Sequence, residues 1–439
     1  MGVHMRSVVR KADQFLQKYG VSADTLPMTE YCDWFLQEMK EGLANGNSSL
    51  KMIPTYIEIG DSIPYDTDVI VIDAGGTNLR TALVRFSEKD GVCISDFRKC
   101  DMPGAKTEVS AKEFFHAFGD AVEPIFTKSD HIGFCFSYAA AVTPERDGRL
   151  IVFSKEIKAP EVIGKLVGSE LLEEMHHRGY TTQKRLTLLN DTVATLLACK
   201  GQPSTSEYSG YIGLILGTGT NTSYIERNSA IRKLDTLDPS GSQIINIESG
   251  NFAVPATPLD KEFFAITKDP EVYHFEKLIS GAYLGSYGHM VLRKAIDGGL
   301  FSTSFSQDFL QKVSNLDTIT MDRFLHSPND RKNIITRCCA DDEDAVLAFR
   351  LLDGVIERAA KLTAVNLAAT VIQSQAGKDP RHPVCINIDG TTYYRTHNLK
   401  KYVEWYLHEY LEKEIGRYYE FVTIEQSPIL GAAIAGLLA

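Results

Sequence analysis

The sequence predicts an α/β fold made of two similar halves. Apolar, strand-like runs alternate with helical patterns along most of the chain, which is typical of α/β proteins. A glycine-bracketed turn followed by Thr-Asn also occurs twice, in "VIDAGGTN" (71–78) and in "LILGTGTN" (214–221), each time after an apolar run. The two copies lie about one domain apart. We therefore expect two related half-folds whose turns face each other.

The predicted elements follow one another without a low-complexity linker. Val8, Ala12 and Phe15 recur at helical spacing and predict helix over 5–45. Apolar runs bounded by polar turns predict the strands, and longer periodic or uniformly apolar segments predict the other helices. The expected strands begin near Val69 and include 131–142, where a strand enters a loop, 185–191, 210–226 and 419–425; the expected helices are 170–180, 192–201, several within 260–375, one near 397–414 and an apolar one after Gly431.

Composition bounds the possible partners. The chain has 439 residues, 44% of them hydrophobic, and a formal net charge of −11. This length allows two or three domains with a large core, and the charge gives no general attraction for nucleic acid or anionic lipid. Any phosphate site must therefore be local. The eight cysteines form no Cys-x-x-Cys pair, and no run approaches ~18 apolar residues, so we expect reduced thiols, a cytoplasmic location and no membrane or nucleic-acid partner.

The first glycine turn is predicted to join two strands. A P-loop would need GxxxxGK[ST], which is absent, and a dinucleotide-binding turn would open a helix. Here the residues after Asn78 alternate as a second strand would. Glycine amides, the hydroxyl of Thr77 and the cation of Arg80 could bind phosphate, and the carboxylate of Asp73 could hold hydrated Mg²⁺ against it. The alternative is a plain hairpin with a polar turn.

Four segments in order resemble the motifs of the hexokinase family, which belongs with the actin-like and Hsp70-type ATPases. "DAGGTNLR" (73–80) and "LGTGTN" (216–221) resemble its two phosphate motifs, "LNDT" (189–192) its catalytic Asn-Asp-Thr and "NIDGTTYY" (387–394) its adenosine segment. The resemblance extends from about residue 60 to 439. It implies a two-domain actin-like ATPase (ribonuclease-H-like) fold with a cleft. The small domain would span 63–198 with the C-terminal helix 429–439, and the large domain would span 1–62 and 199–428.

The resemblance also implies ATP and Mg²⁺ as cofactors. The alternatives are ordinary tight turns at Gly217–Gly219 and at Asp389-Gly390. The implied nucleotide-site residues are Asp73 (which would hold the metal through water), Gly75, Gly76, Thr77, Asn78, Arg80, Gly217, Thr218, Gly219, Thr220, Asp389, Gly390, Thr391 and Ser427.

Phosphorylation of an alcohol needs a group that accepts the hydroxyl proton, commonly a carboxylate. Asp191 lies where a predicted strand gives way to a helix, although Asn190 or Asp191 could simply cap that helix. The resemblance implies that Asp191 is the general base and that Lys155 and Arg80 balance charge. The implied hexose-binding residues are Ser137, Ser154, Lys155, Asn190, Asp191, Asn221, Glu248 and Glu276.

The sequence departs from the family pattern around the expected sugar pocket. Tyr138-Ala139 replace Phe-Pro, and Phe153 and Ser249 stand where the family has tryptophan. We expect an ATP-dependent hexokinase that phosphorylates the 6-hydroxyl of a hexose such as glucose and is a monomer or homodimer. The alternatives are a non-catalytic sugar sensor with this fold and an actin-like or chaperone-type ATPase.

Overall fold

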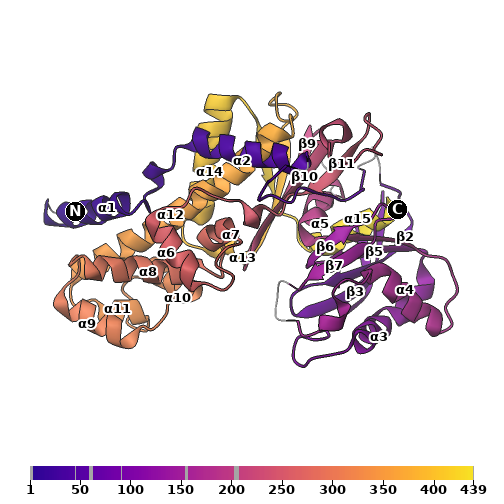
Figure 1. The fold of residues 1–439 in the computed structure, drawn as a ribbon, viewed down its shortest axis with the longest axis horizontal. Helices are drawn as coiled ribbons and strands as arrows, with labels where there is room; N and C mark the ends of the chain where they lie inside the picture. The colour runs from indigo at the N-terminus through magenta and orange to yellow at the C-terminus, as the bar shows by residue number, and fades with distance from the viewer. Residues whose placement is uncertain are drawn as a thin grey trace.

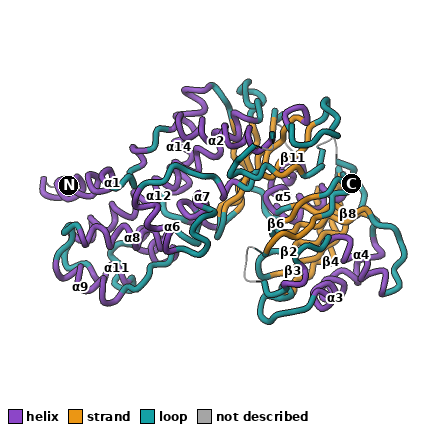
Figure 2. Tube along the Cα trace, viewed as in Figure 1, coloured by secondary structure: helices purple, strands orange, loops and turns teal. Residues whose placement is uncertain are grey.

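The computed structural model describes residues 3–44, 46–58, 63–89, 91–153, 157–201 and 207–438. Two large β-sheets, a two-stranded sheet and a large helical region make up this part of the chain (Figure 1). The sheets and the helices are unevenly distributed: helices dominate one end of the molecule, near the N-terminus, and strands dominate the other, near the C-terminus (Figure 2). Among the helices of the described residues, none has the length and apolar character needed to cross a bilayer.

The first sheet has the strand order β4-β3-β2-β5-β8. Strands β2, β3 and β4 are antiparallel neighbours, whereas β5 is parallel to β2 and β8 is parallel to β5. The bounds are β2 (Asp68–Ala74), β3 (Asn78–Ser87), β4 (Gly91–Asp101), β5 (His131–Phe136) and β8 (Arg185–Leu189); a separate hairpin consists of β6 (Ala139–Val142) and β7 (Gly148–Val152).

The second sheet repeats this arrangement. Its order is β1-β11-β10-β9-β12-β13. Apart from the short β1, each strand has a counterpart in the first sheet, because β11, β10, β9, β12 and β13 take the places of β4, β3, β2, β5 and β8. The pairings are also the same: β9, β10 and β11 are antiparallel, and β12 and β13 are parallel additions. The bounds are β1 (Ile53–Pro54), β9 (Gly210–Leu216), β10 (Thr220–Arg227), β11 (Ser242–Asn246), β12 (Val384–Asp389) and β13 (Tyr419–Val422). The prediction of two related half-folds is confirmed.

Two helices lie between the sheets, each following the last strand of one half (Figure 1). Helix α5 (Asp191–Ala198) packs against β9, and α15 (Ser427–Leu437) packs against β5 and against α5. The approach is close because glycine lies at the contacts. A Cβ on Gly431 would come within 1.9 Å of the carbonyl oxygen of Ala194, and one on Gly133 within 1.8 Å of that of Ala432. A side chain on Gly431 would force α15 away from α5, and one on Gly133 would force α15 away from β5.

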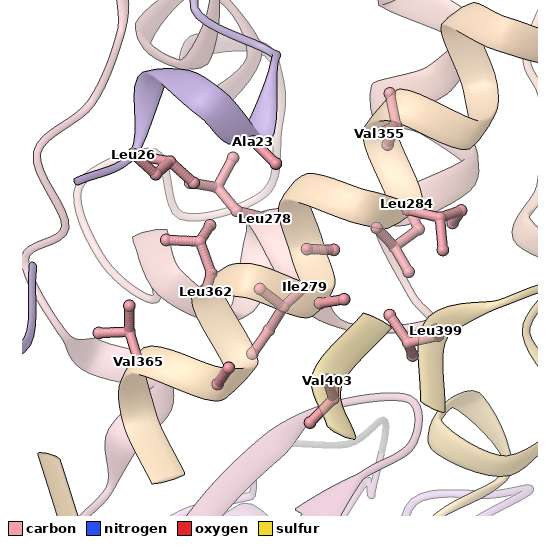
Figure 3. Close-up of a cluster of buried hydrophobic side chains, with 14 of the residues drawn as sticks. Ala23, Leu26, Leu278, Ile279, Leu284, Val355, Leu362, Val365, Leu399 and Val403 are labelled. Atoms are coloured by element: carbon pink, nitrogen blue, oxygen red, sulfur yellow. The ribbon is translucent and has the colours of Figure 1, made fainter. Parts of the chain in front are cut away.

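The remaining helices build the larger core. Figure 3 shows part of it, where leucine and valine side chains of α12 meet those of α7, α8 and α14. The bounds are α1 (Val3–Lys18), α2 (Met28–Leu43), α3 (Ala111–Val122), α4 (Val167–His177), α6 (Pro258–Ile266), α7 (His274–Ile279), α8 (Leu284–Asp297), α9 (Thr303–Lys312), α10 (Thr318–His326), α11 (Ile334–Cys338), α12 (Asp342–Gln373), α13 (Thr391–Arg395) and α14 (Leu399–Leu407), which continues as a π-helix over His408–Ile415.

Three predicted elements differ from the structure. The helical region expected over 5–45 is interrupted: α1 ends at Lys18, just before Gly20 with its φ of 69°, and α2 begins at Met28 directly after Pro27. Gly390 does not turn a hairpin; its φ of 130° connects β12 directly to α13. The last helix begins at Ser427 and not after Gly431, since Pro428 fits the first helical turn. The division into domains at residues 63–198 stays a prediction.

Candidate active site

The turn between β2 and β3 closes on itself and places an ion pair beside it. The amide of Gly75 donates to the carbonyl oxygen of Asn78 at 3.0 Å. Asp73 and Arg80 are register partners on the two strands, and Arg80 Nη1 lies 2.8 Å from Asp73 Oδ2. Burial raises the pKa of Asp73, the Arg80 cation opposes that rise, and the charge of Asp191 adds to it. The β-hairpin predicted from the alternation is therefore confirmed, with a buried carboxylate at its mouth.

The second turn, between β9 and β10, is held from outside. Gly217 donates its amide to the carbonyl oxygen of Gly219 at 3.0 Å. The carbonyl oxygen of Gly217 accepts from the amide of Gly281 at 2.9 Å and from Thr392 Oγ1 at 2.8 Å. Thr218 itself is exposed. The turn thus presents its tip while its base is fixed by two other segments.

Asn190 and Asp191 stand between the two turns in sequence and at the N-terminus of α5. Asn190 Oδ1 accepts from the amide of Thr192 at 2.9 Å, so this side chain does cap the helix. The same oxygen lies 3.5 Å from Asn221 Nδ2. Asn190 can therefore cap α5 and still lie at the expected sugar site.

The negative charge of Asp191 influences carboxyl groups in both the nucleotide motifs and the expected sugar site. Its negative charge contributes to the raised pKa of Asp73 and Asp389, which belong to the nucleotide motifs, and of Glu248, which belongs to the expected sugar site. Burial is the largest cause for each of these three groups. Asp191 therefore lies within electrostatic reach of both the nucleotide motifs and the expected sugar site.

Amides and carboxylates form a connected group next to Asp191. Asn221 Nδ2 donates to Asn246 Oδ1 at 2.7 Å and approaches Glu248 Oε1 at 3.2 Å, and Asn246 Nδ2 donates to Glu248 Oε1 at 2.9 Å. Glu276 Oε2 accepts from the amide of Thr220 at 3.0 Å. Such a group offers donors and acceptors suited to a polyol. Asn246 is absent from the predicted residues; its place at the end of the strand before Glu248 was the available signal.

We expect Glu248→Gln to raise the stability of the ligand-free protein near pH 7. The pKa of Glu248 is raised, chiefly by burial, so the folded state disfavours its charged form, and this cost grows as pH rises from the ordinary carboxyl pKa through the raised one. Glutamine keeps an acceptor for Asn221 and Asn246 but carries no charge. Thermal unfolding at pH 7 and at mildly acidic pH measures the effect. A gain that did not shrink on acidification would contradict this explanation.

A cavity of about 530 Å³ lies beside the second turn. Of the predicted residues, Thr218 and Thr391 line it. Asp389 ends β12, and the adjoining Gly390 would be 3.7 Å from a Cβ on Gly217, so the predicted adenosine segment does meet this turn. The lining residues that sequence reasoning missed are Gly281, Ala282, Thr318, Ile319, Asp322, Arg323, Thr392, Arg395 and Thr396.

Some predicted residues are not brought to this cavity or cannot be placed. Ser154 and Lys155 lie outside the described residues. Ser427 is 1% exposed; its hydroxyl donates to the carbonyl oxygen of Ile424 at 2.7 Å and accepts from Asn387 Nδ2 at 3.0 Å, so it lies in the interior at the start of α15. Ser137 follows β5, and its amide donates to the carbonyl oxygen of Ala74 at 3.1 Å, beside the first turn.

Comparison with known proteins matches the chain to one family. Two family models described as hexokinase match residues 11–201 and 211–438. Hexokinase-7 of Oryza sativa subsp. japonica is 30% identical over 431 residues, covering 90% of each chain. Hexokinase-2 of Solanum tuberosum is 29% identical over 440 residues, covering 93% of this chain and 87% of its own.

Solved structures show the same fold. A hexokinase from Schistosoma mansoni complexed with glucose superposes with a TM-score of 0.76 at 21% identity, covering 99% of this chain and 100% of its own. The ROK hexokinase from Thermus thermophilus gives a TM-score of 0.53 at 16% identity, over 84% of this chain and 97% of its own. With the family models spanning both half-folds, the protein belongs to the hexokinase family of ATP-dependent sugar kinases.

Proposed function

We propose that the protein transfers the γ-phosphoryl group of MgATP to the 6-hydroxyl of a hexose such as glucose, giving hexose 6-phosphate and ADP. One observation carries this proposal: Asp191 opens α5 directly after Asn190, whose Oδ1 lies 3.5 Å from Asn221 Nδ2 in the amide-carboxylate group, and its charge also contributes to the raised pKa of Asp73 and Asp389 beside the phosphate turns. A single carboxylate between a phosphate site and a polyol site is the arrangement that phosphoryl transfer to an alcohol needs.

Asp191 would accept the proton of the hexose hydroxyl as that oxygen attacks phosphorus. The catalytic base must lie within hydrogen-bonding reach of the hydroxyl, and its position at the first residue of α5 fixes it on a rigid element. The hexose would be bound by Ser137, Ser154, Lys155, Asn190, Asp191, Asn221, Glu248 and Glu276, with Asn246 holding Asn221 and Glu248 in place.

The nucleotide phosphates would lie between the two turns. Backbone amides within the two turns, those of Gly76 and Thr218 among them, would donate to phosphate oxygens, and Arg80 and Lys155 would balance developing charge. The amides of Gly75, Gly217 and Thr220 are bonded within the protein and would shape the turns. The residues Asp389, Gly390 and Thr391 would contact the nucleoside at the cavity of about 530 Å³. Ser427 would act at most by supporting this region from the interior, since its hydroxyl is engaged with Asn387 and Ile424.

Several carboxylates at this site would repel the triphosphate of ATP, so a cation is needed for the nucleotide to bind. Asp73 suits Mg²⁺ held through water, because Mg²⁺ keeps most of its hydration and commonly uses one carboxylate plus phosphate oxygens. In the described residues no group of three or more His, Cys, Asp and Glu side chains could hold a metal directly, which favours such a shared site. When bound, the ion would neutralise charge on the phosphates.

Release of ADP with and without glucose tests the function. We expect glucose-dependent ADP release by the native chain in the presence of Mg²⁺, and loss of this release when EDTA removes the ion. Appearance of hexose 6-phosphate in step with ADP would identify the acceptor. Release of ADP at the same rate without sugar would instead indicate an ATPase, and glucose binding without any release would indicate a sensor.

We further propose a monomer or homodimer in the cytoplasm with no nucleic-acid partner. The net charge of −11 argues against nucleic acid as a partner, and the eight scattered cysteines suit a reducing compartment.

A further inference from the structure

Each phosphate turn has the carbonyl oxygen of its first glycine bound by a side-chain hydroxyl from a distant segment. Tyr138 Oη donates to the carbonyl oxygen of Gly75 at 2.7 Å. Thr392 Oγ1 donates to the carbonyl oxygen of Gly217 at 2.8 Å. The two half-folds thus use the same device at equivalent turns, with tyrosine in one and threonine in the other.

The direction of a carbonyl fixes the direction of the amide that follows it. In a trans peptide the C=O and the next N–H lie in one plane and point in opposite directions. A hydroxyl that holds the Gly75 carbonyl therefore turns the N–H of Gly76 away from Tyr138. In the same way, Thr392 turns the N–H of Thr218 away from α13.

The two amides so directed are available to a ligand. Across the part of the chain that the structure describes, the N–H groups of Gly76 and Thr218 donate to no protein acceptor. Thr218 is exposed and lines the cavity of about 530 Å³, and Gly76 is only partly buried. Successive or facing backbone N–H groups that lack internal partners form anion sites.

Both anchoring side chains are rigidly held. Tyr138 is 2% exposed, and its ring makes edge contacts with Phe136 and Phe153 at centroid distances of 4.9 and 5.0 Å. Thr392 is 7% exposed in the first turn of α13. Since neither side chain can readily reorient, each holds its glycine carbonyl in one direction.

We propose that Tyr138 and Thr392 are paired positioning residues, whose hydroxyls aim the amides of Gly76 and Thr218 at the phosphates of the bound nucleotide. The inference rests on the proposed function for the identity of the ligand. Neither hydroxyl needs to touch the nucleotide for this role, although Thr392 also lines the cavity beside the second turn. Without the Tyr138 hydroxyl, the Gly75 peptide can rotate, and a fraction of the molecules presents a carbonyl oxygen to the phosphate in place of the N–H. Without the Thr392 hydroxyl, the Gly217 carbonyl keeps only its bond from the amide of Gly281, so the direction of the Thr218 N–H is less well fixed.

The test is calorimetric binding of MgADP, which does not depend on turnover. We expect Tyr138→Phe and Thr392→Val each to raise the Kd of MgADP by about 3- to 10-fold, in the range of one lost hydrogen bond. Thr392→Ser keeps the hydroxyl and should restore binding to within twofold. The Kd of glucose should change by less than twofold in all three variants, because the hydroxyls point to the phosphate turns.

A matched control is Tyr31→Phe, which removes a hydroxyl that donates from α2 to the carbonyl oxygen of Pro255. This variant should leave the Kd values of MgADP and glucose unchanged. If Tyr138→Phe fails to fold, Thr392→Val decides the proposal.

An unchanged Kd of MgADP in folded variants, or equal losses of affinity for MgADP and glucose, would overturn the proposal. A shift in one variant alone would overturn the role of the other residue. Expected shifts without any sugar phosphorylation by the native chain would overturn the proposed function and leave the anchoring role intact.

Discussion

Replacement of Asp191 by asparagine is expected to lower kcat by about 10²- to 10⁴-fold, the usual contribution of a general base. Asparagine has the same size and can keep the contact with Thr192 at the start of α5, but it cannot accept a proton. The KM for hexose should therefore change by only a few-fold. Steady-state ADP release at saturating glucose measures kcat, and a glucose series measures KM.

Asp341→Asn is a suitable control for this variant. Asp341 is also an acidic residue at a helix N-terminus, where its Oδ1 accepts from the amides of Glu343 and Asp344, and asparagine caps helices equally well. Its kcat should match that of the native chain. Retention of more than about a tenth of kcat by Asp191→Asn would rule out a role as the principal base.

The repeat in the sequence was sufficient to predict the relation between the two sheets. The runs 71–78 and 214–221 end in similar turns because each is the first hairpin of a half-fold with the same strand order. Local patterns of this kind depend on neighbouring residues only, so they can be read from the sequence alone. The position of Asp191 was also accessible, because ligands bind beyond the carboxyl ends of strands.

Other features depend on contacts between distant segments and could not be predicted. Asn246 belongs to the expected sugar site only because β11 pairs with β10. This pairing places Asn246 next to Asn221. The cavity beside Thr218 combines residues of α10 and α13 with the second turn. Helix α15 begins earlier than expected, at Ser427 with Pro428 in its first turn, and Gly431 is explained by its close packing against α5.

Replacement of Arg358 by methionine is expected to destabilise the protein by about 3–5 kcal/mol at neutral pH. Arg358 and Asp260 have side chains that are 2% and 0% exposed, and two hydrogen bonds of 2.9 and 2.7 Å join them between α12 and α6. The hydroxyl of Tyr287 donates to Asp260 Oδ1 at 2.6 Å. Methionine would fill much of the volume but leave the carboxylate of Asp260 buried without a cation. Chemical denaturation of the variant and the native protein gives the difference in the free energy of unfolding.

The pH dependence identifies the cause of this loss. Burial alone would raise the pKa of Asp260, but Arg358 holds it below its usual range, so the pair stabilises the fold above the ordinary carboxyl pKa and this contribution is lost as pH falls through the lowered pKa. In Arg358→Met the pKa of Asp260 should instead be raised, so the deficit should shrink on mild acidification and should also shrink in the double variant with Asp260→Asn. Arg381→Met, which removes an exposed partner of Asp379, should change stability little because solvent screens that pair. Equal losses for the buried and the exposed arginine would show that the buried charge of Asp260 is not the source of the effect.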